Sequence, residues 1–171
     1  MDPMDIRYAW ILWINRDQRG FSSGGTFRDP RTGEILGSKT RMDSHRIRTI
    51  GNYWESYTST SGGGDDDALF LADTGLLEAL AQPAVAGMPA PQRDLVLLRQ
   101  SLLTAHELGH VMGFQHNFTG SLDNFGSVME YPTPRATATG DRLELSEAFA
   151  PTTGLYAGCM TRYASTQLAA D

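Results

Sequence analysis

The N-terminal part of the chain shows apolar runs separated by turn signals, a pattern that predicts β-strands. Residues 7–14 are aromatic, β-branched and almost continuously apolar, which is typical of a buried strand. The serine- and glycine-rich residues 22–26 predict a loop. Residues 26–28 and 35–42 flank a Pro/Gly turn signal at 29–34, so a β-hairpin is predicted. Residues 59–67 predict a solvated polar loop, an interpretation favoured over a Ca²⁺ site built from its three aspartates.

The strongest helical pattern begins at Pro91. Proline suits the first turn of a helix, and Asp94 suits the positive end of the helix dipole. A final helix is predicted at 154–168, after a Gly/Asn/Ser-rich loop at 117–126. Within the first helix, apolar positions at steps of three and four residues predict one buried stripe, formed by Leu95, Leu98, Leu102, Ala105, Gly109 and Met112.

Beside this stripe, the helix carries the pattern H-E-x-x-H-x-x-G-x-x-H. His106 and His110 are one helical turn apart on the same face, so both imidazoles can reach one Zn²⁺ ion. Gly113 can adopt the left-handed conformation that ends a helix, which lets the chain turn and bring His116 back as a third ligand. Glu107 projects from an adjacent face, close to the open metal position where a general base must stand. The pattern therefore predicts a catalytic site with one zinc ion.

The alternative interpretation of this pattern is a helix that carries three solvated or core histidines. At the residue frequencies of this chain, the five fixed letters arise by chance on the order of once in 10⁵ such sequences. Three of the chain's four histidines fall in this short span at ligand spacing, which favours the metal site. The fourth, His45, lies in the polar stretch Asp43-Ser44-His45-Arg46 and is predicted to lie on the surface.

Length and composition restrict the classes of protein that fit. The 171 residues, 40% of them hydrophobic, suffice for one well-buried core and are few for two domains. The formal net charge of −6 argues against nucleic acid as a partner, although an acidic surface could favour basic substrates. No apolar run approaches the roughly 20 residues that cross a bilayer, so no membrane partner is expected. The one cysteine, Cys159, excludes an internal disulfide framework and a cysteine-based zinc finger.

A second motif follows the third histidine, at Ser127-Val128-Met129-Glu130-Tyr131-Pro132. The pattern Ser-x-Met-x-Tyr is weak by itself, because a core methionine is its ordinary explanation. Located a short loop after the zinc pattern it becomes specific, since this pairing defines the metzincins. The chain therefore resembles a metzincin zinc metalloprotease.

Further segments narrow the resemblance to the EcxA-like zinc-binding domain family of bacterial zinc-dependent metalloproteases. These segments are residues 2–8, 29–36, 116–118, 127–132 and 143–151, so the resemblance covers nearly the whole chain. It implies an α+β, metzincin-like zincin fold with a small mixed twisted sheet, a long active-site helix, a Met-turn and a C-terminal helix. Family proteins usually carry large segments before and after this core, and a metzincin normally opens with a strand and a helix ahead of the first strand predicted here.

The resemblance also implies one catalytic domain over residues 1–171. Its upper part, about 1–116, would hold the sheet and the active-site helix, and its lower part, 117–171, the Met-turn and the C-terminal helix. The implied activity is that of a zinc-dependent endopeptidase whose ligands are the three motif histidines. Glu107 would serve as general base and then as general acid, Met129 would pack beneath the ligands, and Tyr131 would approach the zinc or the reacting oxyanion.

Substrate and location follow from the same resemblance. An extended peptide is expected to pair with the open edge of a sheet, for which residues 35–42 are chosen. Residues 132–135 resemble, in position, the wall of the pocket for the residue that follows the cut bond, so Arg135 could bias selection, although a solvated arginine is its ordinary interpretation. We expect a monomer that acts on protein or peptide. A secreted or periplasmic protein is implied, whereas the N-terminus lacks the basic region of a secretory signal and by itself also fits a cytoplasmic one.

Two other functions remain open at this point. The chain could be a zinc-bound binding module of metzincin fold that hydrolyses nothing, but such a module would have little need for Glu107. It could also be a gluzincin-type peptidase in which Glu144 or Glu147 replaces His116 as third ligand. The turn at Gly113 and the adjoining methionine motif argue against the second alternative.

Overall fold

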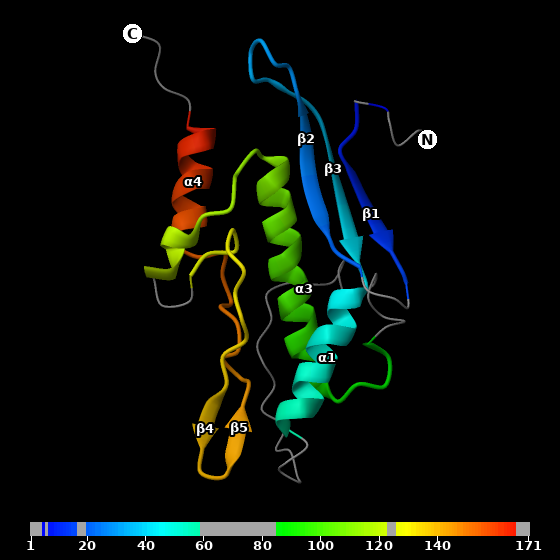
Figure 1. The fold of residues 1–171 in the computed structure, drawn as a ribbon, viewed down its shortest axis with the longest axis vertical. Coiled ribbons are helices and arrows are strands. Elements are labelled where there is room, and N and C mark those ends of the chain that lie inside the picture. The colour runs from blue at the N-terminus through cyan, green and yellow to red at the C-terminus, as the bar shows by residue number, and fades with distance from the viewer. Residues whose placement is uncertain (1–4, 6, 17–19, 59–84, 123–125, 167–171) are drawn as a thin grey trace.

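The computed structural model of the chain describes residue 5 and residues 7–16, 20–58, 85–122 and 126–166, and it shows an α+β fold (Figure 1). Three strands, β1 (Trp10–Ile14), β2 (Ser23–Arg28) and β3 (Ile35–Asp43), form a mixed sheet in the order β1-β3-β2. Strand β1 is parallel to β3, and β2 is antiparallel to it. The predicted fold class, with a small mixed sheet, a long helix and a C-terminal helix, is confirmed.

The remaining described elements are three α-helices, a 3-10 helix and a second small sheet. Helix α1 (His45–Thr58) follows the three-stranded sheet, and the long helix α3 (Ala90–Val111) carries the histidine pattern. In Figure 1, α3 runs through the middle of the molecule, with the sheet on one side and α4 on the other. The rest of the described chain forms the 3-10 helix η1 (Phe118–Leu122), the strand pair β4 (Thr137–Thr139) and β5 (Arg142–Glu144), and helix α4 (Leu155–Ser165).

The predicted hairpin is confirmed, but the predicted loop at 22–26 is wrong. Residues 23–26 belong to β2 and pair with β3, with Gly24 opposite Thr40 and Gly25 opposite Lys39. Glycines usually weaken strands, and here one of them permits a close approach between two backbones. A Cβ atom on Gly24 would overlap the carbonyl oxygen of Glu107 in α3. The glycines of β2 thus allow the strand to lie directly against the helix that carries the histidines.

Two predictions about the strands are corrected by the strand order. Residues 35–42 do not form an open edge, because β3 lies between β1 and β2 and pairs with both. Residues 10–14 do not form a buried strand, since Ile11 is 53% exposed and Leu12 is 39% exposed. Among the described strands, β1 has a hydrogen-bonded neighbour on one side only, so it lies at an edge of the sheet.

The hydrophobic core lies around α3, which packs against β2, β3 and α1. Leu95, Leu98, Leu102 and Gly109 of the predicted stripe are buried, whereas Ala105 is half-buried. Met112 is 49% exposed, because it lies just beyond the end of the helix and outside the core. The buried cluster also takes in Val96 and Leu97 of the same helix and side chains from the C-terminal part of the chain, namely Val128, Met129, Leu145, Ala148, Phe149 and Ala157.

His45 was predicted to lie on the surface, but the polar stretch that contains it is buried or half-buried. Asp43 is 1% exposed and its carboxylate forms an ion pair with Arg16, at 2.8 Å between Nε and Oδ2. The other carboxylate oxygen accepts a hydrogen bond from the backbone N–H of His45 at 2.9 Å. His45 is half-buried at the first position of α1. The ion pair and the hydrogen bond offset the cost of burying the Asp43 carboxylate.

Three predictions on loops and termini have different outcomes. The final helix is confirmed as α4, which ends at Ser165. The predicted loop at 117–126 contains a 3-10 helix, η1, at Phe118–Leu122. The polar loop at 59–67, with its calcium interpretation, lies outside the described residues. None of the described helices combines the length and the apolar character needed to cross a membrane.

The contact between β2 and α3 predicts a difference between two neighbouring glycines. Gly24→Ala should push β2 away from the helix backbone and lower the free energy of unfolding by about 1–3 kcal/mol, the usual cost of overpacking. Gly25→Ala is the matched control, because a Cβ there meets nothing within 4 Å, and it should change stability by less than about 1 kcal/mol. Urea unfolding of both variants measures the difference. Equal midpoints for the two variants would contradict the contact.

Candidate metal centre

The three histidines of the motif converge on one point. Their Nε2 atoms lie 3.1 Å apart between His106 and His110, 3.2 Å apart between His110 and His116, and 3.2 Å apart between His116 and His106. Nitrogens that share one zinc ion at about 2.0–2.1 Å lie roughly 3–3.5 Å from one another. Among the described residues, these three form the group whose ligand atoms could hold a metal ion. The donor set and its spacing therefore fit zinc.

Each imidazole is held through its other nitrogen. The Nδ1 atom of His106 makes a short hydrogen bond with the carbonyl oxygen of Val128, and Nδ1 of His110 lies 2.8 Å from the carbonyl oxygen of Phe114. A carbonyl oxygen only accepts, so Nδ1 carries the proton in both rings and donates it. The lone pair of Nε2 then points to the shared centre, which is the arrangement a metal-binding histidine needs.

The third ring is held by a side chain instead of the backbone. The hydroxyl of Tyr131 lies 3.3 Å from Nδ1 of His116, and the two ring centroids are 4.6 Å apart. Tyr131 is 64% exposed, so its hydroxyl stays accessible from the solvent. The structure thus places Tyr131, which was predicted to approach the zinc or the oxyanion, next to His116, the third predicted ligand.

The chain reaches the third ligand through the turn predicted at Gly113. This residue has a φ of +92°, in the left-handed region that favours glycine. The N–H of Phe114 donates to the carbonyl of Gly109 at 2.9 Å, and a guanidinium nitrogen of Arg28 donates to the carbonyl of Gly113 at 3.2 Å. The tip of strand β2 therefore supports the turn that positions His116.

A buried turn lies beneath the histidines. The N–H of Glu130 donates to the carbonyl of Ser127 at 3.1 Å, which closes the turn, and Met129 inside it is 1% exposed. The sulfur of Met129 packs against Gly109, where a side chain on the helix would overlap it. The carbonyl of Met129 also accepts the N–H of Asn117 at 3.0 Å. The turn is thus tied both to the helix and to the segment that carries His116.

Comparison with known proteins gives a match for residues 90–170. Residues 90–170, which include α3, the three histidines and the methionine turn, match a family model described as Met-zincin. This part of the chain belongs to that family. Neither a curated protein nor a solved structure matched the chain. The protein therefore contains a zinc-binding domain of metzincin type, while the narrower EcxA-like resemblance stays a prediction.

Burial shifts the pKa of two groups in the metzincin site, His106 and Glu107. The pKa of His106 is lowered to about 4, and burial is the largest cause. The neighbouring histidines also lower it, whereas the hydrogen bond to Val128 raises it. The ring is therefore neutral at physiological pH, as a zinc ligand must be. Burial also raises the pKa of the Glu107 carboxyl, which is 4% exposed, and a hydrogen bond from the N–H of Gly24 partly offsets this.

The histidines open into a cleft of about 410 Å³. Its lining includes residues 21–24, around the start of β2, as well as Val128, Tyr131 and Pro132. Arg135 is not among the lining residues, so the predicted role of that residue in the cleft wall is not supported. Two positively charged lining residues, Arg46 of α1 and Arg99 of α3, were not predicted from the sequence. Arg99 follows four consecutive apolar residues of the helix, and this break in the pattern was the available signal.

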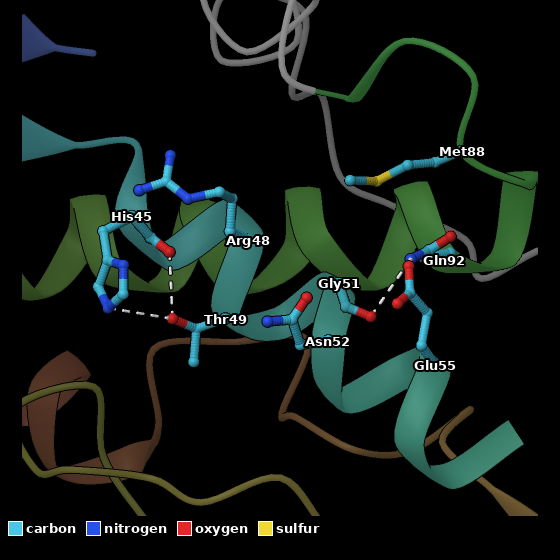
Figure 2. A pocket seen from close by; sticks show the side chains of 8 residues that line it. All are labelled: His45, Arg48, Thr49, Gly51, Asn52, Glu55, Met88 and Gln92. Carbon is cyan, nitrogen blue, oxygen red and sulfur yellow. Dashed lines mark hydrogen bonds between the residues drawn. The ribbon is translucent and has the colours of Figure 1, made fainter. Parts of the chain in front are cut away.

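A second cavity of about 280 Å³ is lined by α1 and by residues at the start of α3 (Figure 2). There the side-chain amide of Gln92 donates to the carbonyl of Gly51 at 3.2 Å. None of the residues of the zinc motif lines this cavity. It is lined by His45, Arg48, Thr49, Gly51, Asn52, Glu55, Met88 and Gln92.

The converging nitrogens predict the metal content of two histidine variants. The wild-type chain should retain one zinc ion per molecule after dialysis, and His116→Ala should lose most of it, since two imidazoles bind zinc far more weakly than three. His45→Ala is the control, because His45 lies outside the cluster, and its zinc content should equal that of the wild type. Elemental analysis of the dialysed proteins gives the stoichiometry. Full zinc occupancy in His116→Ala would show that another residue is the third ligand.

Proposed function

We propose that this protein is a zinc-dependent endopeptidase that hydrolyses peptide bonds in proteins or peptides. The observation that carries the proposal is the position of Glu107, a buried carboxylate next to His106, in an open cleft where three imidazole nitrogens converge. A structural zinc site needs neither the carboxylate nor the cleft, because its ligands close around the ion.

The residues of the cleft have distinct parts in the proposed reaction. Zinc, when bound, supplies a Lewis acid that lowers the pKa of water toward about 7. Glu107 accepts the proton of the attacking water and later donates it to the leaving amine. The raised pKa of its carboxyl makes it a stronger base than a solvated glutamate. The N–H of Gly24 holds the carboxylate in place, so the proton is accepted at a fixed position.

Substrate binding is best supported at the free edge of β2. Within the described part of the chain, β2 pairs with β3 on one side only, and residues 21–24, around its start, line the cleft. An extended peptide could add to this edge through backbone hydrogen bonds and pass in front of the histidines. The edge replaces the one expected from residues 35–42.

The buried turn at Met129 supports the metzincin interpretation of the lower part of the site. We infer that it is the Met-turn, because a buried sulfur packs against the helix directly beneath His106 and His110. The turn would act as an apolar floor that keeps the histidines from shifting. We further propose that the protein is secreted or periplasmic and that it is a monomer.

The gluzincin alternative is less well supported. The cluster that could hold a metal contains three histidines and no glutamate among the described residues. Glu144 in β5 and Glu147 are both exposed. His116, in contrast, has its ring nitrogen 3.2 Å from each of the other two.

The general-base role predicts a separation of metal binding from catalysis. Glu107→Ala should keep its zinc but lose casein cleavage by several orders of magnitude, because no group remains to accept the proton of the water. Glu147→Ala is the matched control and should keep both zinc and activity. Zinc analysis and a fluorescent casein assay on the same preparations test this. Undiminished cleavage by Glu107→Ala would reject the proposal, and no cleavage by the wild type would favour the binding module.

The contact of Tyr131 with the third ligand predicts a milder effect. Tyr131→Phe removes the hydroxyl 3.3 Å from Nδ1 of His116, so zinc affinity should fall by about tenfold, as for other groups that orient a ligand. A fall in kcat at saturating zinc would show that the hydroxyl also acts on the substrate. Tyr163→Phe, on the exposed face of α4, should change neither quantity. Zinc titration and steady-state kinetics distinguish the two effects; a variant identical to the wild type in both would make the hydroxyl dispensable.

A further inference from the structure

The cleft extends away from the histidines along helix α3 to a pair of arginines. Arg99 precedes His106 by seven residues, two helical turns, and therefore lies on the same face about 10 Å further along the axis. Leu102 and Leu103 line the cleft between the two positions. Arg46, from α1, lines the same cleft, and its charge acts on both Arg99 and Glu107. The part of the cleft beside Arg99 therefore combines apolar side chains with positive charge.

Arg99 has an unusual environment for a charged side chain. It is 9% exposed, and the guanidinium stacks on the ring of Phe149, at 5.4 Å from the centroid. Across the described part of the chain, no carboxylate forms an ion pair with Arg99 or with Arg46. Buried arginines are otherwise paired, because an isolated charge is costly to remove from water. The free side of Arg99 faces the cleft that it lines.

The charge on Arg99 is present at neutral pH. Burial, the larger cause, and the nearby positive charge of Arg46 together lower its pKa to about 10. Two like charges therefore lie close together at one end of a cavity. An anion that entered this end would be attracted by both.

The two carboxylates of the cleft have contacts other than an ion pair with the arginines. Glu107 accepts a hydrogen bond from the N–H of Gly24, and the charge of Arg46 acts on it without an ion pair. Glu130 accepts a hydrogen bond from the hydroxyl of Ser121 at 2.6 Å. Neither carboxylate forms an ion pair with the two arginines in the part of the chain that the structure describes. Among the described residues, no carboxylate therefore occupies the position where an anion would meet the guanidinium of Arg99.

We propose that Arg99, supported by Arg46, makes this cleft select substrates with a glutamate or aspartate side chain next to the bond that is cut. The apolar walls accommodate the methylene part of such a side chain, and the guanidinium of Arg99 binds its carboxylate. The inference rests on the proposed peptidase function and adds a substrate class to it. It assigns a specificity-determining role to a residue outside the zinc motif.

Matched peptides test the selectivity without any variant. The peptides are identical except at one position, which carries Glu, Gln or Leu, and this position is moved along both sides of a bond that the wild-type enzyme cuts. At one position adjacent to the cut bond, kcat/KM for the Glu peptide should exceed that for the Gln peptide by about ten- to a hundredfold, the range of a charge-assisted hydrogen bond. Equal rates for Glu and Gln at every position would overturn the inference.

A variant pair assigns the selectivity to Arg99. In Arg99→Met the Glu-to-Gln ratio of kcat/KM should fall to about one, and loss of an unpaired buried charge need not destabilise the fold. Arg162→Met, on the exposed surface of α4, should keep the wild-type ratio. An unchanged ratio in Arg99→Met would exclude this arginine as the selecting group.

Failure of the inference can be told apart from failure of the proposed function. Cleavage of Gln and Leu peptides as fast as Glu peptides would leave the peptidase intact and remove the selectivity. If no peptide is cut, binding of the same labelled peptides to the zinc-loaded Glu107→Ala protein, measured by fluorescence anisotropy, gives the decision. Tighter binding of the Glu peptide than of the Gln peptide would support the pocket, and equal binding would overturn it.

Discussion

The rest of the site depends on the ring of His106, because this ring connects the buried turn at Met129 to the other two histidines. Its Nδ1 atom is bonded to the carbonyl of Val128 in the buried turn, and its Nε2 atom points to the other two histidines. The bond fixes the tautomer of the ring and at the same time fixes the turn against the helix. Since Met129 follows Val128 directly, the same bond keeps the sulfur over Gly109. A shift of the turn would therefore move a ligand, its proton and the floor of the site together.

The parts of the site that follow from local geometry could be predicted from the sequence. The one-turn spacing of His106 and His110 and the left-handed conformation at Gly113 are properties of a short peptide segment, and both are present. The convergence of His116 follows from them. The partners of the rings could not be predicted in the same way. The carbonyls of Val128 and Phe114 come from the backbone, which any residue would supply, so the sequence contains no sign of them.

The arrangement of strands could not be predicted, because strand order depends on contacts between distant segments. Residues 10–14 are apolar enough for a central strand, yet β3 takes the central position and β1 lies at an edge. The glycine-rich residues of β2 resemble a loop when taken alone. The lack of a side chain matters at Gly24, because it allows β2 to lie against the backbone of Glu107 in α3. The hairpin itself was predictable, since its turn is local.

The net charge of the chain does not describe the charges that a substrate meets in the cleft, because distance decides which groups act on it. The formal net charge of −6 is a sum over the whole chain, and salt screens distant charges beyond about 8–10 Å. Arg46 and Arg99 line the cavity itself, and Arg99 is 91% buried, where screening is weak. A peptide that reaches the histidines is therefore under the influence of the two arginines more than of the distant acidic groups. An overall acidic composition accordingly gives no reliable indication of what this cleft binds.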